Sequence, residues 1–160
     1  MKEEDRNPAV CRAFVATAKN IMVHHPEVKH TWSIDADEDH CILDIPKRSE
    51  DGFDITVEVF PYEIIVSADG PHLHFDDIKN DDIKNIEATV QEALGLIRDM
   101  LSPVMRVVEQ RSNGQPYKWH LESYREGQWK REDTTGILFY NFFGRKTKNI
   151  YQNNVLPRRI

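Results

Sequence analysis

The segment from Phe53 to Asp77 constrains the fold more than any other part of the chain, because it predicts three short strands with one shared apolar face. Residues 53–59 alternate strictly, with apolar side chains at odd positions and polar side chains at even positions. This two-residue period is typical of a strand with one buried face. Two turn candidates follow, Pro61-Tyr62 and Asp69-Gly70. Asp-Gly is a favoured hairpin turn, since Gly accepts positive φ freely and Asp better than most residues.

Both turns give the same register. The first sets Val59 opposite Ile64, and the second sets Val66 opposite Leu73. All three strands then place their apolar side chains on one face, and a shift of one residue would move a whole set to the other face. We therefore expect an antiparallel meander at the centre of the fold.

The opposite face of this meander carries the best candidate for a metal or acid–base site. His72, His74 and Asp76 alternate along the third predicted strand and its end. Neutral imidazole binds zinc and similar ions and titrates near neutral pH. A divalent metal at these three residues is the one cofactor that the sequence suggests, and a third strong ligand would have to come from elsewhere.

A small-ligand site is a related hypothesis for the same face. The register places Glu58 in a row with His74, about 10 Å apart across the intervening strand. Glu58 could act as a base or as an orienting carboxylate, and Thr56 and Ser67 would line the next row with His72. The alternative is a solvated sheet face on which histidines lie beside hydroxyls and carboxylates.

Two amphipathic helices are expected to cover the apolar face. Apolar residues recur at helical spacing over residues 10–21 and 83–101, as on a helix with one buried side. Asn80 is the expected cap of the second helix, and the two following aspartates would lie in its first turn. Gly95 interrupts that helix at a cost of about 1 kcal/mol relative to Ala.

The last third of the chain predicts a second meander, with turns at Asn113-Gly114 and Glu126-Gly127. Asn-Gly is the strongest short hairpin signal. The expected cross-strand partners are Val108 with Trp119, Glu109 with Lys118, His120 with Asp133, Glu122 with Arg131, and Tyr124 with Trp129.

The segment GILFYNFF, residues 136–143, is apolar on both faces. Such a strand is either covered on both sides or exposes apolar surface to a partner. The basic residues 145–160 that follow predict either a loose tail or an edge strand.

Together these elements predict a single α+β domain over residues 1–160. Two further strands, Thr31–Asp35 and Cys41–Ile45, precede the first meander. We expect a mostly antiparallel sheet built from two hairpin meanders, with the two amphipathic helices packed on one side.

Charge is distributed unevenly along the chain. Residues 1–104 carry 10 basic and 22 acidic side chains, a net charge of −12, whereas residues 105–160 carry 11 and 5, a net charge of +6. Either the two parts neutralise each other across one surface, or the C-terminal part offers a basic face to an acidic partner. A secretory signal and an apolar run of about 20 residues are both lacking, so a cytoplasmic location without a membrane span is expected.

The leading functional hypothesis is a small cytoplasmic protein-interaction module without catalytic activity. Its partner would be another protein or a second copy of the chain. Aromatic and arginine side chains dominate binding hot spots. The predicted partner-binding residues are therefore Tyr124, Trp129, Arg131, Tyr140, Phe142 and Arg145.

Two alternatives remain open. The first is a metal-binding or acid–base enzyme, or a small-ligand binder, centred on His72, His74 and Glu58. The second is nucleic-acid binding through the aromatic and basic segment 139–151, where rings could stack on bases and lysines could meet phosphates. Nucleotide-dependent enzymes are disfavoured, because the chain has seven glycines and lacks a phosphate loop or dinucleotide fingerprint.

Overall fold

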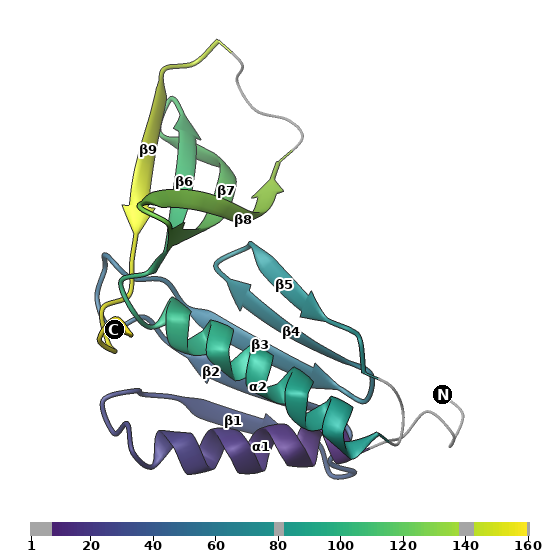
Figure 1. The fold of residues 1–160 in the computed structure, drawn as a ribbon. Helices are drawn as coiled ribbons and strands as arrows, with labels where there is room; N and C mark the ends of the chain where they lie inside the picture. Colours follow the sequence, from purple (N-terminus) through teal and green to yellow (C-terminus); the bar gives the residue numbers. More distant parts are fainter. Residues whose placement is uncertain (1–7, 79–81, 138–142, 160) are drawn as a thin grey trace. The chain divides into compact units, whose positions relative to one another are not determined.

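The computed structural model describes residues 8–78, 82–137 and 143–159 (Figure 1). Two compact units are present: Met1–Pro46, Ile55–Val66 and Leu73–Ile97 form the first, and Lys47–Asp54, Ser67–His72 and Arg98–Ile160 form the second. The elements are α1 (Ala9–Met22), β1 (Thr31–Ile34), β2 (Cys41–Ile45), β3 (Ile55–Phe60), β4 (Glu63–Ala68), β5 (His72–Phe75), α2 (Ile83–Met100), β6 (Met105–Ser112), β7 (Gln115–Arg125), β8 (Gln128–Gly136) and β9 (Lys146–Tyr151). In the described ranges, no helix combines the length and the apolar character that crossing a membrane requires.

The first unit is built on a five-stranded sheet with the order β1-β2-β3-β4-β5. Both turns of the first meander lie where the alternation predicts them. β3 ends at Phe60 and β4 begins at Glu63, while Asp69 and Gly70 have φ values of 53° and 138°. The N–H of Ala68 donates to the carbonyl of Pro71 at 2.8 Å and closes the second hairpin.

The predicted apolar face of this sheet is confirmed. Both helices run along one side of it (Figure 1). The ring of Phe14 on α1 meets Trp32 on β1 edge to face, with centroids 6.1 Å apart. The buried strand residues are Cys41, Leu43, Ile45, Ile55, Val57, Val59, Ile64, Val66 and Ala68. Two helices and two antiparallel sheets establish the α+β class.

The helix α2 begins at Ile83, two residues later than a cap at Asn80 predicts. The side chain of Asp82 accepts hydrogen bonds from the backbone N–H groups of Lys84 at 3.1 Å and Asn85 at 3.3 Å. Asp82 is therefore the capping residue rather than part of the first turn, because its carboxylate satisfies N–H groups that have no partner within the helix. The expected cap, Asn80, lies outside the described residues.

The second unit contains a four-stranded sheet with the order β8-β7-β6-β9. Both predicted hairpin turns are present, with φ values of 50° and 78° at Asn113 and Gly114 and of 52° and 80° at Glu126 and Gly127. Positive φ at both central residues is the signature of the type I′ turn. The basic C-terminal segment supplies β9, which pairs with β6 and is an edge strand of this sheet.

A β-bulge corrects the predicted β6–β7 register. Val108 lies opposite His120 rather than Trp119, and Glu109 lies opposite Trp119 rather than Lys118. The ladder shifts between Gln110 and its C-terminal neighbour, because β7 has one extra residue there. A bulge of this kind places two residues opposite one and cannot be read from alternation alone.

A second bulge corrects the predicted partner of His120. The β7–β8 register shifts between Leu121 and Glu122, so His120 lies opposite Thr134 rather than Asp133. The pairs nearer the turn, Glu122 with Arg131 and Tyr124 with Trp129, are confirmed.

The predicted strand over residues 136–143 is wrong at both described ends. Gly136 is the last residue of β8, Ile137 lies outside any strand, and Phe143 lies in a turn with its side chain 100% exposed. The predicted binding residues Tyr140 and Phe142 lie outside the described part of the chain.

The C-terminal segment of the second unit is anchored by one buried side chain. Asn153 is 4% exposed. Its Oδ1 accepts from the N–H of Phe53 at 3.2 Å, and its Nδ2 donates to the carbonyl of Phe53 at 3.1 Å. Further along, Leu156 is buried and its N–H donates to the carbonyl of Leu101. These contacts satisfy buried backbone groups that would otherwise lack partners.

Candidate functional site

The histidine row on β5 does not converge on a common centre. The Nδ1 of His74 contacts Glu63, whereas the Nδ1 of His72 lies 3.1 Å from the carbonyl oxygen of Gly70. Asp76 follows the end of β5 and is exposed. Within the described ranges, no group of three or more His, Cys, Asp or Glu side chains is placed to hold a metal ion.

The predicted small-ligand residues lie on β3 and β4. Glu58 and Thr56 are half-buried on β3, and Ser67 is half-buried on β4. The hydroxyl of Thr56 donates to the carboxylate of Asp44 at 2.9 Å. This contact joins neighbouring strands, and it explains the position of Thr56 without a ligand.

The C-terminal sheet brings cations and aromatic rings to one face. We name this side of the β8-β7-β6-β9 sheet the basic face. It carries Arg106, Val108 and Gln110 from β6, Lys118, His120, Glu122 and Tyr124 from β7, Trp129, Arg131 and Thr134 from β8, and Lys148 and Ile150 from β9. The strand pairings place these side chains together because alternate residues of a strand share a face.

Two lysines flank one glutamine across three strands of this face. Gln110 lies opposite Lys118 on β7 and opposite Lys148 on β9. The two lysine Cα atoms are therefore about 10 Å apart, two strand spacings. A groove of about 410 Å³ opens beside this row and is lined by Gln110, Tyr117, Lys146, Thr147 and Lys148.

A hydrogen-bonded chain fixes the neutral form of His120, which is 2% exposed. Gln110 Nε2 donates to His120 Nε2 at 3.0 Å, and His120 Nδ1 then donates to the hydroxyl of Thr134 at 2.8 Å. Gln110 in turn accepts from the hydroxyl of Tyr117 at 3.0 Å. Burial lowers the pKa of His120, and the positive charges of Arg131 and Lys118 lower it further. The neutral His120 thus lies near two cations, Arg131 and Lys118, and near the carboxylate of Glu122.

The turn end of the basic face holds an arginine–aromatic stack. The guanidinium of Arg106 lies 4.1 Å from the centre of the Trp129 ring, and its Nε donates to Glu122 at 2.7 Å. Trp129 and Tyr124 have ring centres 5.2 Å apart. The guanidinium of Arg158 lies 5.1 Å from the centre of the Tyr124 ring. Such cation–π contacts hold both partners in place.

Three cations on the basic face are uncompensated. Glu122 is the face's acidic residue, and Arg106 already engages it. Lys118, Arg131 and Lys148 form no ion pair with any residue in the described ranges. Unpaired like charges on one surface create a positive potential that an anionic ligand would relieve.

The structure therefore brings some of the predicted partner-binding residues together on one sheet face with further cations. Tyr124, Trp129 and Arg131 share the basic face, whereas Arg145 precedes β9 and donates its backbone N–H to Asn113 Oδ1 at 2.8 Å. Sequence reasoning missed Arg106, Lys118 and Arg158, and it included Lys148 only in the nucleic-acid alternative, within the basic segment 139–151. The lysine row depends on the β6–β9 pairing, which no local pattern encodes.

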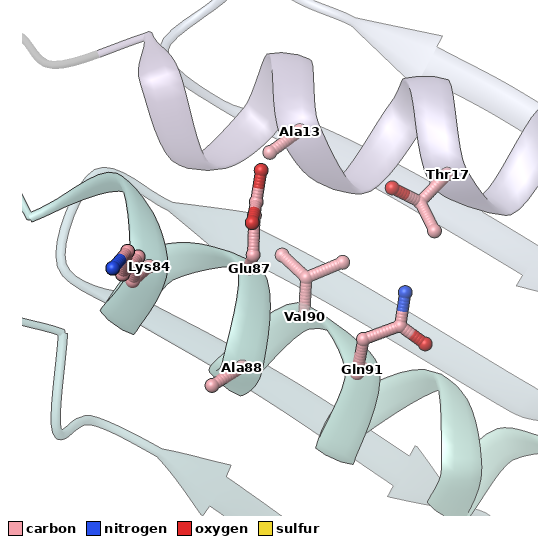
Figure 2. A pocket seen from close by; sticks show the side chains of 7 residues that line it. All are labelled: Ala13, Thr17, Lys84, Glu87, Ala88, Val90 and Gln91. Carbon is pink, nitrogen blue, oxygen red and sulfur yellow. The ribbon is translucent and has the colours of Figure 1, made fainter.

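A second groove, of about 380 Å³, lies between the two helices of the first unit (Figure 2). Glu87 points from α2 toward Ala13 on α1, and Thr17 and Gln91 face each other further along (Figure 2). Small and polar side chains of mixed charge line it: Ala13, Thr17, Lys84, Glu87, Ala88, Val90 and Gln91. It has neither the excess of positive charge nor the aromatic rings of the basic face.

The two cysteines are free and buried. The thiols of Cys11 and Cys41 hydrogen-bond to each other, and burial raises the pKa of both. A protonated thiol is a weak nucleophile, so this pair gives no support to cysteine catalysis.

Comparison with known proteins adds no functional assignment: no family model, no curated protein and no solved structure matches this chain. What the chain does must therefore be inferred from its own side chains.

Proposed function

We propose that this protein is a non-catalytic interaction module that binds an acidic segment of a partner protein on its basic face. The observation that carries the proposal is the set of three unpaired cations, Lys118, Arg131 and Lys148, on one sheet face with the Trp129–Tyr124 stack. Arginine and aromatic residues are enriched where proteins bind one another tightly.

Electrostatics favours an acidic partner. Arg131 and Lys118 lie close enough to His120 to lower its pKa, and the carboxylate of Glu122 is held by Arg106. Carboxylates of a bound segment would neutralise the positive charges of Lys118, Arg131 and Lys148, which form no ion pair in the described ranges of the free protein. Complementary charge of this kind also steers a partner to the surface and rejects partners of the same sign.

The aromatic contacts favour a protein segment over a single-stranded nucleic acid. A nucleic-acid platform needs open ring faces on which bases can stack. Arg106 occupies one face of Trp129, and Arg158 occupies one face of Tyr124. In the neighbouring groove, the ammonium of Lys146 lies 5.2 Å from the centre of the Tyr117 ring. The rings of Trp129, Tyr124 and Tyr117 therefore hold cationic side chains in place, and these side chains offer positive charge to a ligand.

The direct test is a binding comparison between three fluorescent ligands of equal length. They are a glutamate-rich peptide, a neutral glutamine-rich peptide and a single-stranded oligonucleotide. We expect the acidic peptide alone to bind tightly at low ionic strength, with affinity that falls as salt is added. The double variant Lys118→Glu, Lys148→Glu should bind it at least about tenfold more weakly.

The matched control is the double variant Lys29→Glu, Arg48→Glu, which changes net charge equally at exposed positions that do not belong to the basic face. It should retain the affinity of the wild-type protein within about twofold, since it leaves every side chain of the basic face in place. Equal losses in both double variants, or no saturable binding of the acidic peptide, would overturn the proposal. Preferential binding of the oligonucleotide would replace it with the nucleic-acid function.

A further inference from the structure

We propose that the partner segment binds as an added β-strand along the outer edge of β9. This inference rests on the proposed function and states how the acidic segment is held. β9 is the last strand in the order β8-β7-β6-β9, and five of its six residues are exposed. An edge strand presents backbone groups that an extended chain can pair with.

The register of β9 shows which backbone groups point outward. The N–H of Asn113 donates to the carbonyl of Arg145 at 2.9 Å, and residues 113 and 145 are the next pair after Ser112 and Lys146 in the β6–β9 register. Hydrogen-bonded and non-hydrogen-bonded pairs alternate in an antiparallel ladder. Residues 147, 149 and 151 therefore bond to β6. The backbone groups of Lys148 and Ile150 face away from it, on the side of β9 with which no described strand pairs.

The same residues carry the recognition side chains. Lys148 and Ile150 project from the basic face, because they lie opposite Gln110 and Val108. A strand added about 4.8 Å outside β9 would place every second side chain beside this row. An acidic side chain there would meet Lys148, and an apolar one would cover Ile150, which is 47% exposed. The expected ligand is thus an extended segment that alternates acidic and apolar residues on one face.

Charge also argues against a second copy of β9 as the occupant. Lysines on an edge strand commonly prevent pairing with like chains. Two β9 strands side by side would bring Lys148 and Lys146 of each copy close together, and like charges directly opposite destabilise a strand pair. The same lysines attract an acidic strand and repel a second copy of β9, so they would favour an acidic partner.

Two substitutions at one position test the inference. Lys148→Pro removes the outward N–H, and proline is tolerated on an edge strand where the N–H faces solvent. Lys148→Gln removes the charge and keeps the N–H. With an alternating Glu-Val peptide as ligand, we expect Lys148→Gln to weaken binding severalfold and Lys148→Pro to weaken it by about a further tenfold. Circular dichroism and thermal unfolding would confirm that both variants fold.

Hydrogen exchange of the wild-type protein provides an independent measurement. Adding the peptide should slow exchange of the Lys148 and Ile150 amides, whereas the Asn149 amide, already bonded to β6, should change little. This measurement decides the matter even when Lys148→Pro does not fold. Equal affinity of the two variants, or unchanged exchange at Lys148 and Ile150 in saturated complex, would overturn strand addition and leave the proposed function standing. Failure of the wild-type protein to bind any acidic peptide would overturn both.

Discussion

Lys118 and Lys148 lie on opposite sides of Gln110 in one row of the C-terminal sheet, and neither forms an ion pair with a residue of the described ranges. Lys118 lies on β7 and Lys148 on β9, two strands that are not consecutive in the chain. They become neighbours because β9 returns along the free side of β6. This pairing gathers basic residues from different parts of the chain on one face of the sheet.

Gly95 should tolerate and prefer a side chain. A Cβ added at this position would meet no atom within 4 Å, and the residue lies in the interior of α2. Gly95→Ala is expected to raise the free energy of unfolding by about 0.5–1 kcal/mol, because alanine loses less backbone entropy in a helix. Urea unfolding measures the change, and an unchanged or lower midpoint would contradict it.

Gly52 should behave in the opposite way. A Cβ there would lie 2.6 Å from Asn153 Oδ1, the atom that accepts the N–H of Phe53. Gly52→Ala is expected to lower the free energy of unfolding by about 1–3 kcal/mol, since the amide must move and leave a buried donor unpaired. A free energy of unfolding equal to that of the wild-type protein in the same urea experiment would show that the Asn153 side chain can move without loss of stability, and would contradict this prediction.

Asn153 should be the most sensitive residue of the C-terminal segment. Its side chain satisfies both backbone groups of Phe53 in a buried position. Asn153→Ala is expected to cost about 2–4 kcal/mol, because two buried polar groups lose their partners. The exposed neighbour provides the control: Asn154→Ala should change stability by less than about 0.5 kcal/mol. Similar values for the two variants would contradict the anchoring role.

His120 should make stability depend on pH. Its pKa is lowered in the folded protein, mainly by burial. The unfolded chain therefore binds more protons between that lowered pKa and the ordinary value of about 6.5. The contribution of neutral His120 is fully present above pH 6.5 or so, and it is lost as pH falls through the folded pKa. In urea unfolding at several pH values, His120→Gln should reduce this slope, and an unaltered slope would contradict it.

The first meander could be predicted from the sequence because its information is local. Strict alternation from Phe53 to Val59 and the Asp69-Gly70 turn specify one register, and the burial of Val57 and Val66 confirms it. The second meander was only partly predictable. Its two turns can be recognised from their Asn-Gly and Glu-Gly sequences, but the β-bulges change the cross-strand partners of Val108 and His120. A bulge depends on how both faces pack, and that information is spread over several strands.

Some residues of the candidate site could be predicted from the sequence, but the full set of residues that share its face could not. Tyr124, Trp129 and Arg131 could be proposed because they flank one tight turn. The proximity of Lys118 and Lys148 could not be predicted, since it requires the non-local β6–β9 pairing. The histidine row shows the converse: correct alternation on β5 brought His72 and His74 to one strand face, while their ring nitrogens took separate local partners.

Mapping the binding surface by NMR tests the central claim most directly. An acidic peptide would be titrated into ¹⁵N-labelled protein, and backbone amide shifts would be followed to saturation. We predict that the largest shifts fall on the basic face and its edge, at residues such as Lys118, Arg131 and Lys148, with the helices α1 and α2 little affected. Shifts centred on His72 and His74 or on the inter-helix groove, or no saturable shifts, would contradict the basic face as the binding surface.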